Sequence, residues 1–197
     1  FRVAYDDAAI YIGAMLYDRS PITPRLQRRD GGGGDFDYIT VSLDSYHDHE
    51  TVYQFSVNPS GSFADAVASS GGGGGGGGGR GGGGGRGGSY DSSWDPVWEV
   101  ATRISEAGWS AEMRIPFSQL RFSPADEQVW GIQIKRNIHR NQETVAFPFV
   151  PTLERGGASR FSHLDGIEGI EPGRRLELLP YVAGRGEYLQ LPSPSGV

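Results

Sequence analysis

The chain has 197 residues, of which 37% are apolar and 21% charged, and it contains no cysteine. The absence of cysteine excludes a disulfide scaffold, a thiolate metal site and a cysteine nucleophile. The balance of 18 basic against 24 acidic residues argues against a protein that coats nucleic acid. No apolar run reaches the roughly 18 residues that a membrane-spanning helix needs.

Apolar and polar residues alternate along most of the chain, a period of two that is typical of β-strands. In chain order the alternation predicts strands over residues 1–5, 10–17, 38–43, 53–57, 63–68, 98–104, 109–115, 130–138 and 144–150, with a short strand near 161–164. Residues 106–108 predict a hairpin turn and residues 116–120 one helical turn. Strands with one apolar and one polar side, joined by short turns, favour an all-β fold, an antiparallel β-sandwich with immunoglobulin-like or jelly-roll-like layers over residues 1–170.

Half of the 32 glycines lie within residues 71–88, where only Arg80 and Arg86 interrupt them. Glycine offers no side chain to bury and loses the most entropy when it is ordered. The tract is therefore predicted to be a disordered surface loop between two strands. The alternative is an Arg-Gly-Gly segment that binds RNA, but two arginines in a net acidic chain do not favour it.

Aspartates gather near the ends of the predicted strands, notably Asp6, Asp7 and Asp37. One interpretation is that they cap turns through the neighbouring backbone. The other is a structural calcium ion held by these three carboxylates, since calcium takes oxygen ligands. His47 and His49 could share one side of a turn and ligate a metal, but no third ligand is evident nearby, and His139 and His163 stand alone in the sequence. We therefore expect no catalytic site and favour a turn with exposed histidines.

Several aromatic residues occupy the polar side of their strands or lie outside the alternation. They accompany amide and charged side chains, and an aromatic ring beside such groups is typical of a sugar-binding surface. Exposed tyrosines are also common in sheets for propensity reasons alone. The rings concerned are Tyr11, Tyr17, Phe36, Tyr38 and Trp94, and the polar residues are Gln54, Ser56, Gln133, Lys135, Asn137 and Arg140.

An ordered series of phrases resembles carbohydrate-binding module family 9. The phrases are AYDDAAIYIG at 4–13, DFDY at 35–38 leading to VSLD at 41–44, FSVNPSG at 55–61, WEVA at 98–101 and GWSAEMRIPFSQL at 108–120. The resemblance spans residues 1 to about 165 and implies a β-sandwich, carbohydrate binding and, in some members, bound calcium. Members of that family hold a sugar between two tryptophans. At the corresponding places this chain has Phe36 and Tyr38, then Phe147 and Phe149.

The same series also resembles N-terminal domains of bacterial outer-membrane proteins, in which a phrase like RLELLPYV at 175–182 leads into a membrane β-barrel. The resemblance thus implies an outer-membrane, periplasmic or cell-surface location, with residues 171–197 as a linker and the first strand of a truncated barrel. We expect a non-catalytic carbohydrate-binding domain in which Phe36, Tyr38, Trp94, Phe147 and Phe149 stack on sugar and Arg136, Asn137 and Arg140 supply polar contacts. The alternative is a structural domain that packs on its own barrel as a plug, lid or assembly platform.

Overall fold

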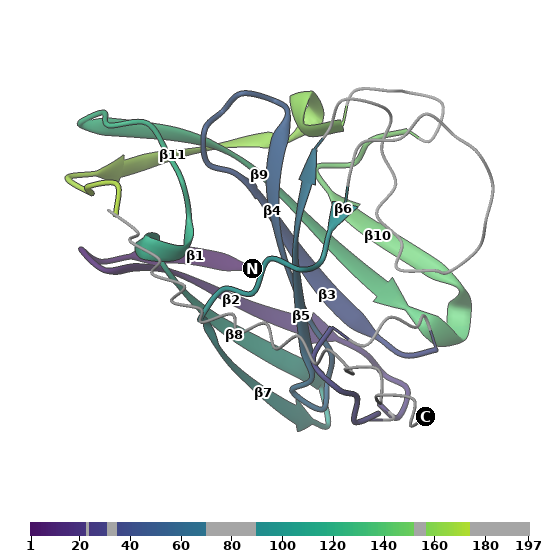
Figure 1. Cartoon of the computed structure of the whole chain (residues 1–197). Helices are drawn as coiled ribbons and strands as arrows, with labels where there is room; N and C mark the ends of the chain where they lie inside the picture. The colour runs from purple at the N-terminus through teal and green to yellow at the C-terminus, as the bar shows by residue number, and fades with distance from the viewer. Residues whose placement is uncertain (23, 31–34, 70–89, 152–156, 174–197) are drawn as a thin grey trace, which may run out of the picture.

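The computed structural model describes residues 1–22, 24–30, 35–69, 90–151 and 157–173. Two antiparallel sheets face each other across one core, and they form a β-sandwich (Figure 1). This confirms the predicted fold class. The predictions of a flexible loop over residues 71–88 and of a barrel strand within residues 174–197 lie outside the described residues.

The smaller sheet has four strands in the order β1-β2-β8-β7. Their bounds are β1 Arg2–Tyr5, β2 Ala9–Tyr17, β8 Gly108–Pro116 and β7 Glu99–Ser105. The predicted hairpin is present as β7 and β8, with Ser105 opposite Gly108. The predicted helical turn after β8 is the short 3₁₀ helix η1, Phe117–Gln119.

The larger sheet has seven strands, in the order β10-β9-β3-β4-β5-β6, and β11 also pairs with β9. The strands are β3 Tyr38–Asp44, β4 Thr51–Val57, β5 Phe63–Ser69, β6 Tyr90–Asp91, β9 Glu127–Ile138, β10 Glu143–Phe147 and β11 Ser162–Glu168. Two further 3₁₀ turns, η2 His139–Asn141 and η3 Gly157–Arg160, precede β10 and β11. The strand predicted over 144–150 is shorter than expected: it ends at Phe147, and Pro148 has no backbone N–H to continue the ladder.

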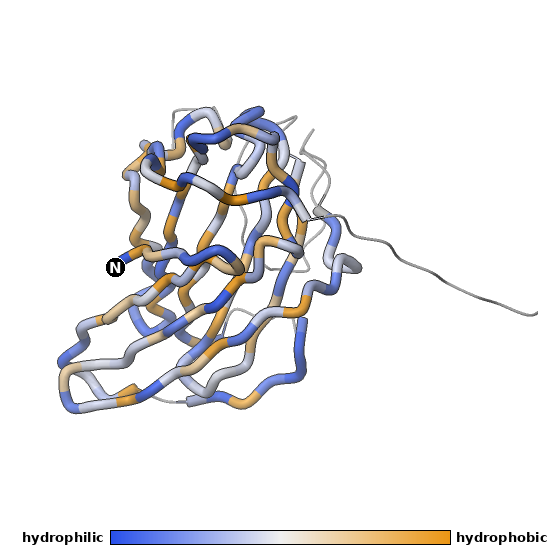
Figure 2. Tube along the Cα trace, turned by 90° about the vertical axis from the view of Figure 1, so that its left-hand side faces the viewer, coloured by the Kyte–Doolittle hydropathy of each residue, from blue (hydrophilic) through white to orange (hydrophobic). Residues whose placement is uncertain are grey.

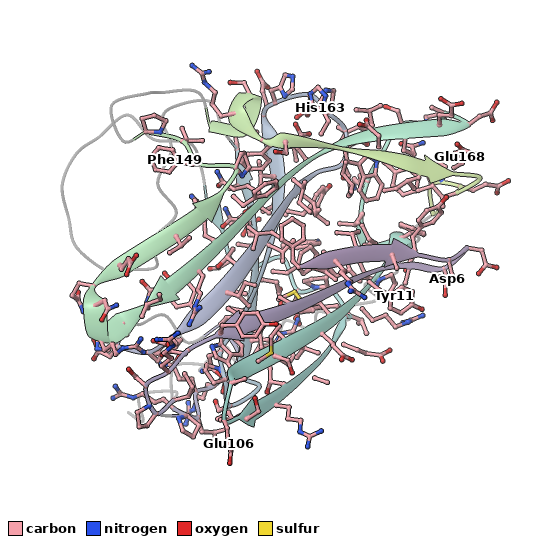
Figure 3. The ribbon with its side chains drawn as sticks, turned by 180° about the vertical axis from the view of Figure 1, so that it is seen from behind. Asp6, Tyr11, Glu106, Phe149, His163 and Glu168 are labelled. Carbon is pink, nitrogen blue, oxygen red and sulfur yellow. The ribbon has the colours of Figure 1, made fainter. Side chains whose placement is uncertain are left out.

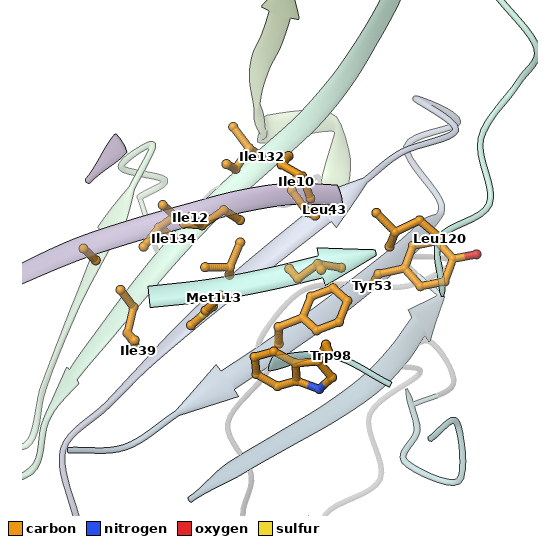
Figure 4. Packing of buried hydrophobic residues seen from close by; sticks show 14 of the residues in the cluster. Ile10, Ile12, Ile39, Leu43, Tyr53, Trp98, Met113, Leu120, Ile132 and Ile134 are labelled. Carbon is orange, nitrogen blue, oxygen red and sulfur yellow. The ribbon is translucent and has the colours of Figure 1, made fainter. Parts of the chain in front are cut away.

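Alternate residues of both sheets point inward and form the core, as the period of two predicts. Along β2 the inward residues Ile10, Ile12 and Leu16 are almost fully buried, and Figure 2 shows the same alternation of apolar and polar positions along the strands. Figure 4 shows how side chains of the two sheets interdigitate. Trp109 and Trp130 are completely buried and belong to the core.

No helix in the described part of the chain combines the length and the apolar character needed to cross a membrane.

Candidate functional site

The outward side of the larger sheet carries a continuous set of polar side chains from three adjacent strands. Residues that oppose each other in an antiparallel pair point to the same face of the sheet. Tyr38, Thr40 and Ser42 of β3 lie opposite Asn137, Lys135 and Gln133 of β9, and Thr40 and Ser42 also lie opposite Ser56 and Gln54 of β4. We call these eight residues the polar face.

The polar face is partly shielded from solvent. Ser42 and Gln133, at the end of the polar face away from Tyr38, are buried, and the other members are half-buried. The Thr40 and Ser56 hydroxyl groups form a hydrogen bond with each other at 2.7 Å. Burial of this kind strengthens each hydrogen bond that a polar ligand could make there.

An aromatic pair lies at one end of the polar face. The rings of Phe36 and Tyr38 are tilted against each other, with 5.9 Å between their centroids. The Asn137 side-chain amide donates a hydrogen bond of 3.1 Å to the Phe36 carbonyl and so holds the segment that leads into β3. Three of the predicted site residues, Phe36, Tyr38 and Asn137, are therefore brought together by the fold.

Lys135 provides the positive charge of the polar face. Its ammonium group is partly desolvated, and this burial lowers the pKa of Lys135 below the ordinary lysine value. Within the described ranges, Lys135 forms no ion pair. A cation held among hydroxyl and amide groups is suited to contact sugar hydroxyl groups or a sugar carboxylate.

The two predicted arginines have other partners. Arg136 follows Lys135 on the opposite side of β9 and donates hydrogen bonds to the Tyr17 carbonyl at 2.8 Å and to Asp18 Oδ2 at 3.0 Å. Arg140 binds both oxygens of the same Asp18 carboxylate. The structure thus places both guanidinium groups in a link between the sheets and apart from the polar face.

Phe147 and Phe149 lie away from the aromatic pair. Phe147 opposes Ile134, whose side chain points to the core side of β9, whereas Tyr38 points to the outward side. The Phe147 ring packs against Phe1, with 5.2 Å between the ring centroids, and Phe149 is exposed beyond the end of β10 (Figure 3). The four phenyl and phenol rings do not form a facing clamp.

Trp94 lies on the core side of the larger sheet and borders a separate cavity. Its ring packs on Tyr53 and Phe55, with centroid distances of 5.1 and 5.7 Å. The cavity has a volume of about 950 Å³, and its lining includes Trp94, Tyr53, Tyr46 and Arg121. This cavity is therefore a second site, separate from the polar face, at which aromatic and polar side chains lie together.

Asp6 and Asp37, proposed above as calcium ligands, serve as acceptors for the backbone. Asp6 Oδ1 accepts hydrogen bonds from the N–H groups of Ala8 and Ala9, Asp6 Oδ2 accepts one from the Tyr11 hydroxyl, and these bonds lower the pKa of Asp6. Asp37 Oδ1 accepts the His139 N–H at 2.8 Å. These contacts match the turn-capping interpretation. Within the described residues, the carboxylates of Asp6, Asp7 and Asp37 are not grouped closely enough to share a metal ion.

The tyrosines on the polar side of β2 belong to a different surface. Tyr11 and Tyr17 lie on the smaller sheet, so the fold separates them from Tyr38. Tyr11 accepts a hydrogen bond from Arg114 in addition to its bond to Asp6, and it lies near Asp6 in Figure 3.

No protein-family model and no curated protein matches the sequence. Solved structures do match the fold. A carbohydrate-binding module of family 9 from Caldicellulosiruptor kristjanssonii in complex with cellotriose superposes with a TM-score of 0.50 at 16% identity, over 90% of this chain and 78% of that chain. A candidate carbohydrate-binding protein from Bacteroides uniformis superposes with a TM-score of 0.61 at 13% identity, over 86% of this chain and 77% of that one. The fold resembles that of family 9 modules.

The same Caldicellulosiruptor module in complex with glucose matches with a TM-score of 0.48 at 15% identity, over 91% of this chain and 78% of that chain. At these identities the likeness to family 9 concerns the fold alone, so the site must be argued from this chain's own residues. Sequence reasoning identified most of the polar face by strand parity but did not include Thr40 and Ser42. Their position on the same strand side as Tyr38 was the signal that could have found them.

Proposed function

We propose that this chain is a non-catalytic carbohydrate-binding domain and that sugar binds on the polar face. The single observation that carries the proposal is the arrangement of hydroxyl, amide and ammonium groups on three adjacent strands beside the Phe36–Tyr38 ring pair. A sugar presents an apolar ring face to aromatic side chains and its hydroxyl groups to polar ones. The fold likeness to the family 9 module and to the Bacteroides protein supports the same conclusion.

Each part of the polar face has a distinct role in this proposal. The Tyr38 ring, with the Phe36 ring tilted against it, stacks on the sugar ring at one end. Lys135 offers a cation in the middle of the face that is already partly desolvated, and the half-buried Gln54 offers an amide donor and acceptor at the end away from Tyr38. Because sheet pairing fixes the backbone that carries these groups, no backbone order has to be gained when the ligand binds.

Calorimetric titration with glucose, cellotriose and a panel of other mono- and oligosaccharides, including uronic acids, tests the proposal. We expect at least one sugar to bind with a dissociation constant below ~10 mM, which corresponds to about −2.7 kcal/mol. Tyr38→Ala is expected to weaken that binding about fivefold or more, since a stacked ring contributes about 1 kcal/mol.

Two variants locate the binding site. Tyr11→Ala removes a tyrosine of the smaller sheet and should leave the affinity unchanged. Trp94→Phe alters the separate cavity and should also have no effect if sugar binds on the polar face. Equal losses in Tyr38→Ala and Tyr11→Ala, or a loss confined to Trp94→Phe, would contradict the proposed location, and the absence of any binding sugar would refute the function.

We further propose that the domain acts at the bacterial outer membrane, in the periplasm or on the cell surface, beside a β-barrel of the same protein. The support is the resemblance of residues 175–182 to the phrase that leads into such barrels. Fractionation of cells of the natural host tests the location. Recovery of the protein in the cytosol alone would contradict it.

A second candidate function is docking of the domain on its own barrel. An apolar edge favours it: Val145, Phe147 and Phe149 of the β10 segment are 48%, 49% and 80% exposed, and Phe1 adjoins them. This candidate predicts that Phe149→Ser separates the domain from the barrel in a cross-linking assay while sugar binding is unchanged. The two functions use different surfaces, so the two assays distinguish them.

A further inference from the structure

Three of the four histidines meet around a buried carboxylate at the end of β3. The ring centroids of His47 and His49 are 4.6 Å apart, and those of His47 and His163 are 4.9 Å apart. Asp44, the last residue of β3, is completely buried, and its Oδ2 lies 3.5 Å from His49 Nδ1. The carboxylate of Asp44 and one nitrogen each of His47 and His49 lie within 4.8 Å of one another.

The backbone around Asp44 holds this group in place. Asp44 Oδ1 and Oδ2 accept the N–H groups of Asp48 and His49 at 3.1 and 2.9 Å, which folds the loop back over the end of the strand. His47 and His49 both have positive φ angles, 54° and 61°. Non-glycine residues adopt this conformation at a cost of about 1–3 kcal/mol each, so the surrounding contacts impose it.

The sheet brings the third histidine to the same place. Gly131 of β9 lies between Asp44 on β3 and His163 on β11, opposite both of them. A Cβ atom at Gly131 would lie 3.1 Å from the Cβ of Asp44 and 3.3 Å from that of Phe161. Glycine therefore keeps this position open, and the His47 ring reaches the ring of His163, whose side chain is exposed on β11 (Figure 3).

One nitrogen in this cluster has no partner. His47 Nδ1 is buried without a hydrogen bond from any described group. A buried polar atom without a partner costs about 1–3 kcal/mol. A metal ion satisfies such a nitrogen directly, because neutral imidazole is a metal ligand through either ring nitrogen.

We propose that Asp44, His47 and His49 bind a divalent transition-metal ion of the zinc class and that His163, whose ring contacts the ring of His47, turns in as a fourth ligand. Imidazole nitrogens suit zinc, nickel and copper ions, whereas calcium takes oxygen ligands. Ligand atoms about 2.1 Å from a tetrahedral zinc ion lie about 3.4 Å apart. The ligand atoms of Asp44, His47 and His49 lie within 4.8 Å of one another, so some of them have to approach by about 1 Å or more. Side-chain rotation in the half-exposed loop permits this approach. The bound ion would link the β3–β4 loop to β11. Asp44 lies two residues beyond Ser42 on the same side of β3, so the metal site borders the polar face.

Metal titration of the chain tests the proposal, with the protein purified without a histidine tag and freed of metal by a chelator. We expect saturable binding of one Zn²⁺ or Ni²⁺ ion per chain by calorimetry, a rise in melting temperature with Zn²⁺, and no comparable binding of Ca²⁺ or Mg²⁺. Co²⁺ serves as a spectroscopic probe, because its visible absorption reports nitrogen ligation in a tetrahedral site.

Histidine variants locate the ion. His47→Ala, His49→Ala and His163→Ala should each weaken Zn²⁺ binding at least about tenfold, since even residues that only support a ligand contribute about 10-fold to 100-fold. His139→Ala is the matched control and should bind like the wild type, because His139 lies in η2 after the end of β9, whereas the cluster lies at Gly131 of that strand. His163 is exposed on β11, so its variant gives an answer even if a loop variant does not fold. Absence of one-to-one binding, an unchanged affinity in His163→Ala, or equal losses in all four variants would overturn the proposal.

Discussion

Arg140 holds both oxygens of the Asp18 carboxylate, with Nη1–Oδ2 and Nη2–Oδ1 distances of 2.7 and 2.8 Å. Arg136 adds a third hydrogen bond to the same group. Asp18 follows β2 of the smaller sheet, whereas both arginines belong to the β9–η2 segment of the larger one. This carboxylate therefore links the two layers of the sandwich at one end.

Asp18→Asn is expected to lower the free energy of unfolding by about 2 kcal/mol. The Asp18 side chain is almost fully buried, so both arginines lose a charge-assisted acceptor, although Arg140 stays partly solvated. Denaturant unfolding measures the loss. Glu99→Gln breaks the exposed ion pair with Arg114 and is the matched control, with an expected loss below about 1 kcal/mol. Equal losses in the two variants would contradict a structural role for Asp18.

The same carboxylate makes stability depend on pH. Hydrogen bonds from Arg140 lower the pKa of Asp18 in the folded chain. The stabilisation by Asp18 is therefore complete above its unfolded pKa of about 3.9 and is lost as the pH falls through the lower folded value. We expect the difference in unfolding free energy between wild type and Asp18→Asn to be constant from about pH 5 to pH 8 and to shrink below about pH 4. A difference that grows in acid would contradict this assignment.

Lys135→Met should stabilise the unliganded chain slightly and weaken sugar binding. Burial lowers the pKa of Lys135, which means that the charged form is less favourable in the folded than in the unfolded state. Methionine keeps the apolar stem and removes the charge. The expected gain is about 0.5 kcal/mol, since the ammonium group keeps part of its water. The gain should vanish as the pH rises towards about 10.4, where the unfolded lysine also loses its proton.

Thermal or denaturant unfolding from pH 7 to pH 10 measures the gain for Lys135→Met, and sugar titration measures the loss of affinity. Stability gained at the expense of binding is the usual mark of a functional residue. A variant that binds sugar as well as the wild type would remove Lys135 from the proposed site.

Gly108→Ala is expected to destabilise the sandwich by at least about 3 kcal/mol. Gly108 has a φ of 129° at the start of β8, and a Cβ atom there would lie 2.1 Å from the Leu16 carbonyl oxygen. Gly13→Ala on the adjoining strand β2 is the matched control, because a Cβ atom at Gly13 meets nothing within 4 Å. That control should be neutral or stabilising by up to about 1 kcal/mol. Denaturant unfolding of both variants checks the contrast, and a similar loss in both would show that the close approach is not the cause.

The strands could be predicted from the sequence because their signal is local. Ile10, Ile12 and Leu16 alternate with more polar residues, and an apolar side of period two has to be buried as one face. The side of each strand on which Tyr38, Gln54 and Gln133 lie follows from the same parity. The hairpin turn before Gly108 could also be predicted, because a short segment separates two stretches of alternating residues that become β7 and β8.

Strand parity could not predict which strands pair or which side chains distant in the sequence contact each other. Strand parity does not say that β9 lies beside β3, so the union of Tyr38 with Asn137 on one face depended on how the strands pair. Arg136 and Arg140 were predicted to contact sugar, but Asp18, 122 residues before Arg140, supplies the carboxylate that binds them. Trp94 was predicted to stack on sugar, but strand parity could not show that it packs on Tyr53 beside a separate cavity.

The histidine cluster shows which contacts depend on local sequence and which depend on how the strands pair. Their spacing of two residues is enough to place His47 and His49 in one loop, because it constrains neighbours along the chain. Folding of the whole domain is needed to bring Asp44 close to them and to bring His163, more than a hundred residues later, into contact with His47 beside Gly131. The physical reason is that such contacts depend on strand register and on close approach over a glycine, both of which arise when the two sheets pack.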